Sequence, residues 1–395
     1  MTLKVLELFG GIGACTKALE RLGVPHEVVD YVEIDKYAVK SFNAIHGTNF
    51  EPQDITNWDK DIECDLIMHG SPCQDFSLAG KQAGGDKGSG TRSSLMYETL
   101  RIVEKLQPKY VIWENVKNLI SKKHFHNFDA YLEVMKNLGY VNYYQVLNAK
   151  DYGVPQNRER VFTISIRNDI KKDFFFPTPF PLERKLKDII EDSVDEKYYL
   201  SPEKIEMISK WKCYEKPLQH IKEGDDILGT LTTRSGAECG GLKLIKIKGA
   251  YGRNYGSKGK LENLDKEIGT LQAAMGEGGG NVPLIPIKTA NKLGYDLAQD
   301  GDGIDLSYPD SNTRRGRVGH GVSKTLATAD YQGVLDGVRI RKLTPKECWR
   351  LMGFDDIDFE KAESVNSNSQ LYKQAGNSIV VNVLEVILKG LLCKS

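Results

Sequence analysis

Short apolar runs alternate with amphipathic stretches from the start of the chain to about residue 170. In one amphipathic stretch Met96, Leu100, Val103 and Leu106 recur at helical spacing. A repeated strand–helix–strand order predicts parallel strand pairing and a sheet that helices cover on both faces, which is an α/β fold. Strands are predicted over Lys4–Phe9, Val28–Ile34, Asp65–His69, Tyr110–Glu114, Tyr143–Asn148 and Val161–Arg167, and helices over Ala14–Leu22, Lys36–His46, Ser93–Leu106 and Phe128–Leu138.

The pattern changes after Arg167. Phe174–Pro181 is a run of prolines and aromatic residues that cannot form a helix interior, so we expect a domain boundary there. More than half of the 38 glycines lie between Gly229 and Gly337, where long apolar runs are scarce. This glycine-rich region is expected to be mostly irregular and β-structured.

A helical pattern returns at Thr344–Met352 and at Ser378–Leu392, and the second stretch is apolar enough to pack on the first domain. The glycine-rich region is therefore interpreted as an insertion. We expect one domain over residues 1–180, an inserted domain over 186–339 and a return of the chain to the first domain over 340–395.

Composition adds exclusions rather than a function. Hydrophobic residues make up 40% and charged residues 27% of the chain, which excludes mostly disordered, collagen-like and coiled-coil classes. No window resembles a transmembrane helix or a signal peptide. The seven cysteines are scattered without a CxxC pair, so we expect a reducing cytoplasm and no zinc ribbon. The net charge of zero does not indicate a nucleic-acid partner.

A glycine turn follows the first predicted strand. Gly11 and Gly13 allow a tight turn and a close approach of a ligand, although Thr16 stands where a dinucleotide fingerprint has its third glycine. Glu33 ends the second strand, where an acid can bind ribose hydroxyls, and Asp54 could accept a hydrogen bond from an adenine amino group. Together they favour an adenosine-containing cofactor, either a nicotinamide dinucleotide or S-adenosylmethionine.

Reactive side chains follow the next predicted strands. Cys73 comes directly after a strand and after Pro72, in a polar loop at the edge where such sheets bind ligands. A cysteine in this position is a candidate nucleophile if its surroundings stabilise the thiolate. Glu114 should lie beside it, and alternation places Arg158 and Arg160 on one face, able to reach a ligand oxygen or a phosphate.

These motifs make the chain resemble the C5-cytosine DNA methyltransferases of bacteria and phages. The resemblance covers Lys4 to about Phe180 and Arg341 to Leu392 and leaves the middle unmatched. It implies a Rossmann-like, S-adenosylmethionine-dependent methyltransferase domain with an inserted target-recognition domain. The motifs, in the family's usual order, are Phe9–Gly13, Pro72-Cys73-Gln74, Glu114-Asn115-Val116, Gln156-x-Arg158-x-Arg160, Arg341–Phe354 and Gln374–Ser378.

The resemblance implies a mechanism on double-stranded DNA. The target cytosine is flipped out of the duplex, Cys73 adds to its C6, and Glu114 contacts N3 and the amino group. Arg160, supported by Arg158, lies near the thiol and the base. S-adenosylmethionine donates the methyl group to C5 and leaves as S-adenosylhomocysteine, with no metal. We expect a monomer in the cytoplasm, on nucleoid DNA, with any cognate restriction endonuclease acting separately.

The resemblance also implies binding residues. A lid over the DNA is expected in the glycine-rich loop Ala79–Ser94. Cofactor contacts are implied for Phe9, Gly11, Gly13, Glu33, Ile34, Asp54, Ile55, Pro72, Leu95, Asn377 and Ser378. DNA contacts are expected for Gln74, Ser77, Lys81 and Arg92. In the inserted region the candidates for contacts with base edges are Arg234, Arg253, Gln272 and Arg315.

Several positions depart from the family pattern. Glu7 replaces the usual aspartate before the glycine turn, Gly10 replaces alanine, and Ala14 stands where a second glycine after Gly13 is common. Ile34 replaces the aromatic residue that often covers the adenine, so we expect a modest change in cofactor affinity.

Local clusters of positive charge lie in the inserted region. Gly241–Lys260 carries six basic residues, two tyrosines and no acid, and Arg314–Arg317 is a second cluster, both suited to phosphate contact. A Thr-Leu step recurs at residues 230–231, 270–271 and 325–326. It indicates either repeated strand–turn chemistry or a shared recognition role.

Three alternatives remain open at this point. A transfer-RNA cytosine methyltransferase would use the same motifs, but a shorter insertion is expected there. A nicotinamide dehydrogenase would not need the Pro-Cys, Glu-Asn-Val and Gln-x-Arg-x-Arg motifs together. A catalytically silent DNA-binding relative would not need Cys73 and Glu114. The target DNA sequence cannot be derived from the chain.

Overall fold

The computed structural model describes residues 2–72, 95–208, 282–337 and 339–393, with short strand fragments at 214–215, 245–246, 250–252, 275–276 and 279–280. The chain forms two compact units. The first contains residues 1–184, 325–329 and 345–395, and the second contains residues 185–324 and 330–344. Residues 325–329, which fall inside the range expected for the insertion, therefore pack with the first unit.

The elements of the first unit follow the sequence pattern closely. The strands are β1 (Leu3–Leu8), β2 (His26–Val32), β3 (Leu66–His69), β4 (Tyr110–Val116), β5 (Tyr140–Asn148), β6 (Gln156–Asn157) and β7 (Glu159–Arg167). The helices are α1 (Ala14–Arg21), α2 (Lys36–His46), α3 (Met96–Leu106), α4 (Phe125–Asn137), α6 (Pro345–Arg350), α7 (Asp356–Glu363), α8 (Asn368–Asn377) and α9 (Val381–Leu392). Most element ends agree with the predicted ones within a few residues, whereas α7 and α8 were not predicted.

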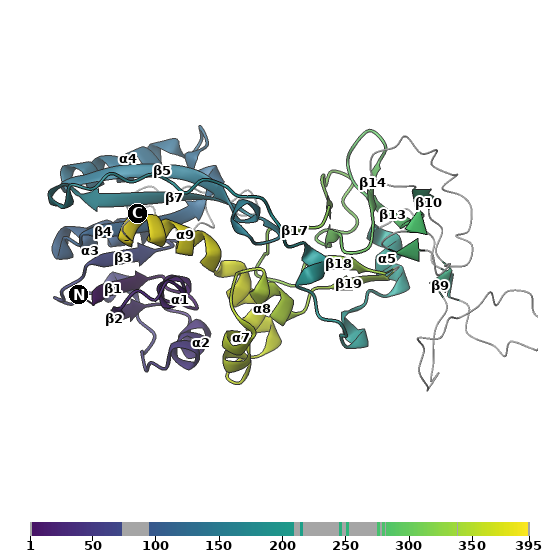
Figure 1. Cartoon of the computed structure of the whole chain (residues 1–395), viewed down its shortest axis with the longest axis horizontal. Coiled ribbons are helices and arrows are strands. Elements are labelled where there is room, and N and C mark those ends of the chain that lie inside the picture. The colour runs from purple at the N-terminus through teal and green to yellow at the C-terminus, as the bar shows by residue number, and fades with distance from the viewer. Residues whose placement is uncertain are drawn as a thin grey trace, which may run out of the picture. The chain divides into compact units, whose positions relative to one another are not determined.

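The central sheet has six strands in the order β2-β1-β3-β4-β7-β5 (Figure 1). Strands β1 to β4 are parallel, but β7 runs antiparallel to both β4 and β5. The α/β, Rossmann-like class is confirmed, and the prediction of parallel pairing throughout is wrong for β7. The reason is local, because the chain between β5 and β7 holds only the 3₁₀ turn Ala149–Tyr152 and the two-residue strand β6, and this connection is too short for a parallel crossover.

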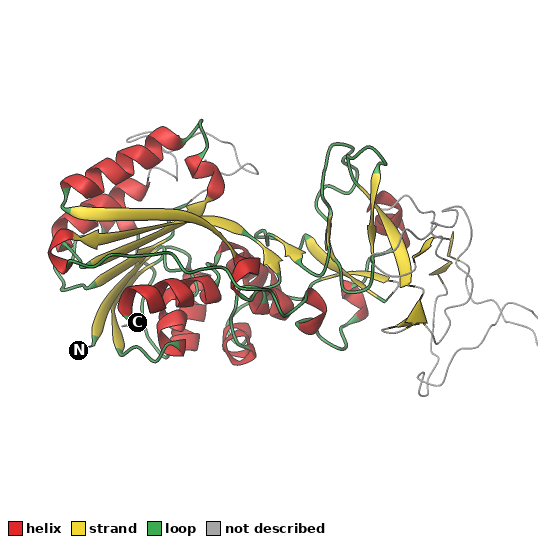
Figure 2. Cartoon of the chain, turned by 45° about the horizontal axis from the view of Figure 1, so that its top comes forward, coloured by secondary structure: helices red, strands yellow, loops and turns green. Residues whose placement is uncertain are grey.

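Helices cover both faces of this sheet (Figure 2). On one face α3 and α4 pack on alternate residues of β1, β3 and β4, as expected from the period-two pattern of a strand. On the other face α1 lies beside α9, whose apolar side is buried. The residues that form the first of these clusters include Leu6, Leu8, Ile67, Val111, Trp113, Leu100, Val103, Phe128, Tyr131 and Met135.

One stretch of the described chain, Asn368–Leu392, is long and apolar enough by composition to cross a membrane. In the structure it is not one helix, because α8 ends at Asn377 and α9 begins at Val381. The apolar residues Leu384, Ile387 and Leu388 of α9 are fully buried. Their hydropathy is therefore explained by packing within the first unit.

The second unit is built from antiparallel strands. A four-stranded sheet has the order β16-β15-β18-β19, and a three-stranded sheet has the order β10-β13-β14. Ile285, Ile304, Leu335 and Ile340 belong to one buried cluster, so both sheets share a core. The elements are α5 (Pro202–Ile208), β8 (Tyr214–Glu215), β9 (Ile245–Lys246), β10 (Ala250–Gly252), β11 (Met275–Gly276), β12 (Gly279–Gly280), β13 (Val282–Lys288), β14 (Tyr295–Ala298), β15 (Gly303–Asp305), β16 (Val318–Gly319), β17 (Ser323–Lys324), β18 (Gln332–Asp336) and β19 (Arg339–Lys342).

Gly376 marks a close approach between α8 and residues 325–329. A Cβ atom at this position would overlap the backbone carbonyl of Ala327. We expect Gly376→Ala to lower the free energy of unfolding by about 1–3 kcal/mol, measured by denaturant titration, because backbone must move to make room. The control Gly390→Ala lies on the exposed side of the last turn of α9 and should raise stability by about 0.5–1 kcal/mol. Equal stability of the two variants would contradict the close approach.

Candidate functional site

The parallel strands β1, β2, β3 and β4 bring their carboxyl ends to one edge of the sheet. This is the edge at which open α/β sheets bind ligands. The glycine turn follows β1, Glu33 follows β2, and Gly70 follows β3. Glu114 lies in β4 directly after Trp113, which pairs with His69, the last residue of β3. The residues singled out in the sequence therefore come together from four strands.

The glycine turn after β1 has a backbone that few residue types tolerate. Phe9 adopts φ 54°, Gly11 φ 56° and Gly13 φ 80°. A Cβ atom on Gly13 would overlap the side chain of His46 beneath the turn, whereas a Cβ atom on Gly11 would meet no described atom within 4 Å. The open space at Gly11 fits a bound molecule that approaches the backbone closely. A left-handed phenylalanine is a strained feature of the kind found at binding sites.

Glu33 connects the end of β2 to this turn. Its carboxylate accepts hydrogen bonds from the backbone N–H of Gly11 (3.2 Å) and of Asp35 (2.8 Å). Burial raises the pKa of Glu33, and the two backbone donors oppose that shift. Beside it the side chain of Ile34 is 68% exposed, which is unusual for an aliphatic residue next to a half-buried acid. This combination places a carboxylate next to an uncovered apolar surface.

The structure separates the two residues predicted to bind the adenine. Asp54 is exposed and caps a short 3₁₀ turn, accepting hydrogen bonds from the backbone N–H (2.9 Å) and the hydroxyl (2.8 Å) of Thr56. The side chain of Ile55 is only 4% exposed and belongs to the core cluster under α3. A cofactor contact by the Ile55 side chain is therefore not supported, because its methyl groups are packed against the protein.

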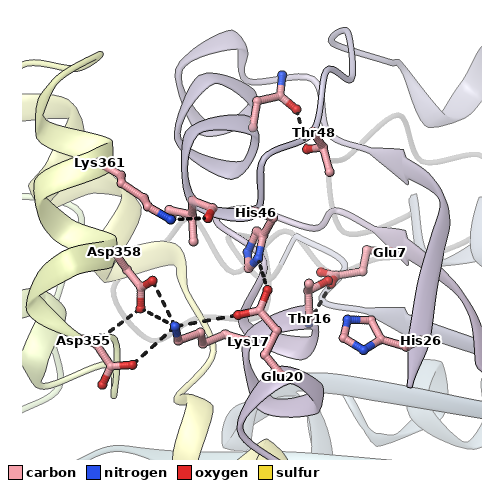
Figure 3. Close-up of polar contacts among 12 residues, drawn as sticks. Glu7, Thr16, Lys17, Glu20, His26, His46, Thr48, Asp355, Asp358 and Lys361 are labelled. Carbon is pink, nitrogen blue, oxygen red and sulfur yellow. Dashed lines mark hydrogen bonds and ion pairs between the residues drawn. The ribbon is translucent and has the colours of Figure 1, made fainter. Parts of the chain in front are cut away.

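A cluster of polar side chains from α1, α2 and α7 lies next to the glycine turn, which it contacts through His46 (Figure 3). His46 Nδ1 lies 2.8 Å from a carboxylate oxygen of Glu20, and Lys17 pairs with Asp358 of α7 at 2.9 Å. Glu7 accepts hydrogen bonds from the backbone N–H (2.9 Å) and the hydroxyl of Thr16. The cluster ties α1 to the C-terminal part of the first unit.

The structure gives a role to Glu7, which replaces the family's usual aspartate. Burial raises the pKa of Glu7, and the hydrogen bond from the Thr16 hydroxyl opposes that shift. Glu7 points to the start of α1, whose first turn contains no acidic residue. Its carboxylate therefore satisfies a helix donor at the N-terminus of α1, where negative charge is favourable.

Glu114 and Arg160 form a buried ion pair at the edge of the sheet. In the antiparallel register of β4 with β7, Val116 faces Arg160, so Glu114 and Arg160 are diagonal neighbours on one face. Arg160 Nε lies 3.0 Å from Glu114 Oε1. Burial raises the pKa of Glu114, whereas the positive charges of Arg160 and Arg158 lower it. A carboxyl group in this setting can hold a proton at a pH where an exposed one is ionised.

Arg158 has a different role from the one that strand alternation predicted. It is 4% exposed, and its guanidinium donates to the backbone carbonyls of Leu326 (3.2 Å), Gly376 (3.1 Å) and Ser378 (2.8 Å). Arg158 therefore positions the chain around the site and acts on Glu114 through its charge. The prediction that it reaches a ligand oxygen directly does not match this geometry.

The neighbouring Gln156 strengthens the same connection. Its side-chain amide donates to the Leu351 carbonyl (2.7 Å) and accepts from the Leu326 backbone N–H (3.3 Å). Thr325 donates its hydroxyl to the Asn157 carbonyl at 2.8 Å. The third Thr-Leu step thus serves to hold residues 325–329 in the first unit, while the other two steps lie outside the described residues.

The other face of β4 holds the chain that leaves β3. Trp113 Nε1 donates to the Ser71 hydroxyl (3.0 Å), and Asn115 Nδ2 donates to the Ser71 carbonyl (3.2 Å). Sequence reasoning did not assign a role to Ser71 or Asn115. The sequence signal that could have found Asn115 is its position directly after Glu114 in an otherwise apolar strand, and the structure shows that Asn115 is buried. The chain is thereby fixed two residues before Cys73.

The end of α8 reaches the same edge. A Cβ atom on Gly70 would lie 3.5 Å from Ile379 Cδ1 and 3.8 Å from Glu114 Oε2. Asn377 is exposed and Ser378 is buried at the end of the helix, so Asn377 can contact a ligand and Ser378 offers its backbone. Pro72 and Leu95, also expected at the cofactor, are half-buried.

Of the residues predicted to contact DNA, the described part of the chain contains Arg315, which is exposed in the second unit. Among the described residues there is no group of three or more His, Cys, Asp or Glu side chains that could hold a metal. Outside the described residues lie Cys73, Gln74, Ser77, Lys81, Arg92, Arg234, Arg253 and Gln272, together with the whole loop Ala79–Ser94 and most of the basic stretch Gly241–Lys260.

Comparisons with known proteins agree over the full length of the chain. A family model described as "C-5 cytosine-specific DNA methylase" matches residues 3–393. The orphan methyltransferase M.Rho11sI of Bacillus phage rho11s is 34% identical over 99% of this chain and 98% of its own. The type II methyltransferase M2.ScrFI of Lactococcus lactis subsp. cremoris is 30% identical over 98% and 99%. A solved mutant of Spodoptera frugiperda DNMT2 shares the fold, with a TM-score of 0.57 at 19% identity over 99% of both chains.

The two arginines should respond differently to truncation. Arg158→Ala leaves three backbone carbonyls without their guanidinium partner, so we expect a loss of about 3 kcal/mol in the free energy of unfolding. Arg160→Ala removes one ion pair at the edge and should cost less stability, but lower the catalytic rate on the order of a hundredfold. Denaturant titration and initial rates measure the two effects. Equal destabilisation by both substitutions would contradict the positioning role of Arg158.

Proposed function

This chain belongs to the C-5 cytosine-specific DNA methylase family, and from that premise we propose how its residues methylate carbon C5 of cytosine in double-stranded DNA. The methyl donor of such an enzyme is S-adenosylmethionine. The observation that carries the proposal is the buried pair of Glu114 and Arg160 at the sheet edge, beside the fixed approach to Cys73. The enzyme would act as a monomer on cytoplasmic, nucleoid DNA, and any cognate endonuclease would act separately.

S-adenosylmethionine fits the carboxyl edge of β1 and β2. When bound, it supplies an electrophilic methyl group next to the cytosine. The open space above Gly11 would receive its methionine part, and the Glu33 carboxylate would accept hydrogen bonds from the ribose hydroxyls. The exposed side chain of Ile34 would cover one face of the adenine. Phe9, Gly13, Asp54, Pro72, Leu95, Asn377 and Ser378 would complete the site.

Cys73 is the proposed nucleophile. Carbons C5 and C6 of cytosine are stacked inside the duplex, so the base must leave the helix to react. The thiolate would bond to C6 and move the electron pair of the C5–C6 double bond to C5, which becomes nucleophilic enough to take the methyl group. Loss of the C5 proton to a base and departure of the thiolate would then restore the aromatic ring.

Glu114 would stabilise the electron-rich ring. Cytosine N3 is a hydrogen-bond acceptor, so only a protonated carboxyl can donate to it. Burial favours that protonated form by raising the pKa of Glu114. Arg160 would hold the carboxyl in place and lie near the base, and Arg158 would fix the surrounding backbone.

The inserted region would read the DNA sequence. We assign target recognition to residues 186–339, with 1–180 and 340–395 carrying catalysis, and to its basic stretches we assign phosphate contact. Gln74, Ser77, Lys81 and Arg92 would contact DNA from the loop after the nucleophile, which would close over the flipped base.

The nucleophile is tested by substitution and by trapping. We expect Cys73→Ala to lower methyl transfer on the order of a thousandfold or more while cofactor binding persists, because the covalent route is lost. The parent enzyme should form a stable conjugate with 5-fluorocytosine duplexes, since the C5 fluorine cannot leave as a proton does. Bisulfite sequencing of DNA from expressing cells reports the product, and Cys393→Ala is the matched control. Methylation by Cys73→Ala, or faster transfer to transfer RNA than to DNA, would refute the proposal.

The pH dependence tests the state of Glu114. As pH rises through its raised pKa, the carboxyl loses the proton that N3 needs, so single-turnover rates should fall on the alkaline side of that pKa. Arg160→Gln removes a positive charge that lowers this pKa, so the falling limb should move to higher pH. Glu114→Gln should remove the limb at a lower overall rate. A limb that stays at the same pH in Arg160→Gln would contradict the assignment.

A further inference from the structure

An exposed tyrosine in the second unit is held in a strained backbone conformation. Tyr308 has φ 48°, in the left-handed region that costs most residues free energy, and its side chain is 71% exposed. An exposed ring contributes little to a core, so folding gains little from tyrosine here. Glycine or asparagine would fit this backbone with less strain. The choice of tyrosine therefore indicates a role outside the folded core.

A buried arginine fixes the backbone at this tyrosine. The guanidinium of Arg317 is fully buried and donates to the carbonyls of Asp305 (3.0 Å), Ser307 (2.7 Å) and Tyr308 (2.6 Å). Burial lowers the pKa of Arg317, which shows that placing a cation here is unfavourable unless the carbonyls compensate. The Tyr308 carbonyl also accepts from the Ser311 backbone N–H at 3.0 Å. The backbone around Tyr308 is thus fixed before any ligand binds.

Positive charge lies beside the ring. The guanidinium of Arg314 lies 5.9 Å from the centre of the Tyr308 ring and is paired with Asp305 at 2.6 Å. Arg315 is exposed, and no described residue forms an ion pair with it. Asp310 is the exposed acid of the same loop. The loop therefore carries an exposed aromatic ring beside the Arg314 guanidinium, and the exposed Arg315 is the next residue in the chain. Aromatic rings and arginines in one loop are suited to nucleic acid, which offers π faces and sugars beside phosphates.

A neighbouring turn braces the two arginines. The Arg314 carbonyl accepts from the Ala290 backbone N–H at 2.7 Å, and the Gly316 backbone N–H donates to the Thr289 hydroxyl at 2.9 Å. Both flanks of Arg315 are therefore held by backbone hydrogen bonds. A contact made by a pre-organised loop loses less conformational entropy on binding.

We propose that Tyr308 and Arg315 form a DNA-contact element of the second unit, with the ring packing on a sugar or base and the guanidinium on an adjacent phosphate. This inference rests on the proposed function; it adds Tyr308 to the expected DNA contacts and assigns Arg315 to a phosphate. Strain is retained at Tyr308 because the ring must project from the surface. Arg314 orients the ring, and its charge is already balanced by Asp305.

The decisive variant is Tyr308→Gly, because it should separate stability from DNA binding. Relief of strain should leave the melting temperature equal to or above that of the parent, whereas the KM for DNA should rise roughly tenfold. The KM for S-adenosylmethionine and kcat should stay unchanged. Tyr308→Phe keeps the ring and should keep the parent KM for DNA. The substrate is chromosomal DNA from a host that lacks cytosine methylation, and incorporation of radiolabelled methyl groups gives the rates.

The matched control is Lys171→Gly in the first unit. Lys171 is also an exposed residue with a left-handed backbone, φ 47°, so glycine relieves the same kind of strain away from the proposed contact. It should leave the KM for DNA unchanged. Arg315→Ala should raise that KM and make it less dependent on salt concentration, because one phosphate contact is lost.

The outcomes separate this inference from the proposed function. If the parent enzyme transfers no methyl group to DNA, the proposed function fails. If the parent methylates DNA and Tyr308→Gly keeps the parent KM, the DNA-contact element is refuted. A lower melting temperature for Tyr308→Gly would also overturn it, because the ring would then serve the fold.

Discussion

A single buried guanidinium, that of Arg158, holds together stretches of chain that are far apart in the sequence. It binds the carbonyls of Leu326, Gly376 and Ser378, and its charge also acts on Glu114. The carboxyl edge of the sheet is complete only when these later segments pack against it. The electrostatic environment of Glu114 and the closure of the first unit therefore depend on the same side chain, which explains why an arginine with five donors stands there.

The sequence pattern predicted the strands and most helices of the first unit because each buries one regular apolar face. It failed at β7, since periodicity gives the position of a strand but not its direction, and the short turn at Ala149–Tyr152 reverses the chain. Helices α7 and α8 escaped prediction because their contacts with α2 are polar. Gln374, for example, donates to the Tyr37 carbonyl and accepts from Ser41.

The candidate site was predictable where strand ends carry the chemistry. Glu33 and Glu114 meet at the edge because parallel strands must end there. Strand alternation placed Arg158 and Arg160 on one face, but in the antiparallel register of β4 with β7 only Arg160 forms an ion pair with Glu114. The hydrogen bonds that Trp113 and Asn115 donate to Ser71 are tertiary contacts, and the strain at Tyr308 is a matter of backbone angles. Residue spacing encodes neither of them.

The chain changes unit after residues 184, 324, 329 and 344. Residues 330–344 supply Leu335 and Ile340 to the core of the second unit, whereas Thr325 and Leu326 bind Asn157, Gln156 and Arg158 in the first. Recombination that transferred only residues 185–324 between homologues would leave residues 330–344 of the recipient in place. The core of the second unit would then combine side chains from two different proteins. Transfer of the intact second unit between homologues thus requires breakpoints outside 185–344, and the donor's Thr-Leu step must still fit the recipient's Gln-x-Arg motif.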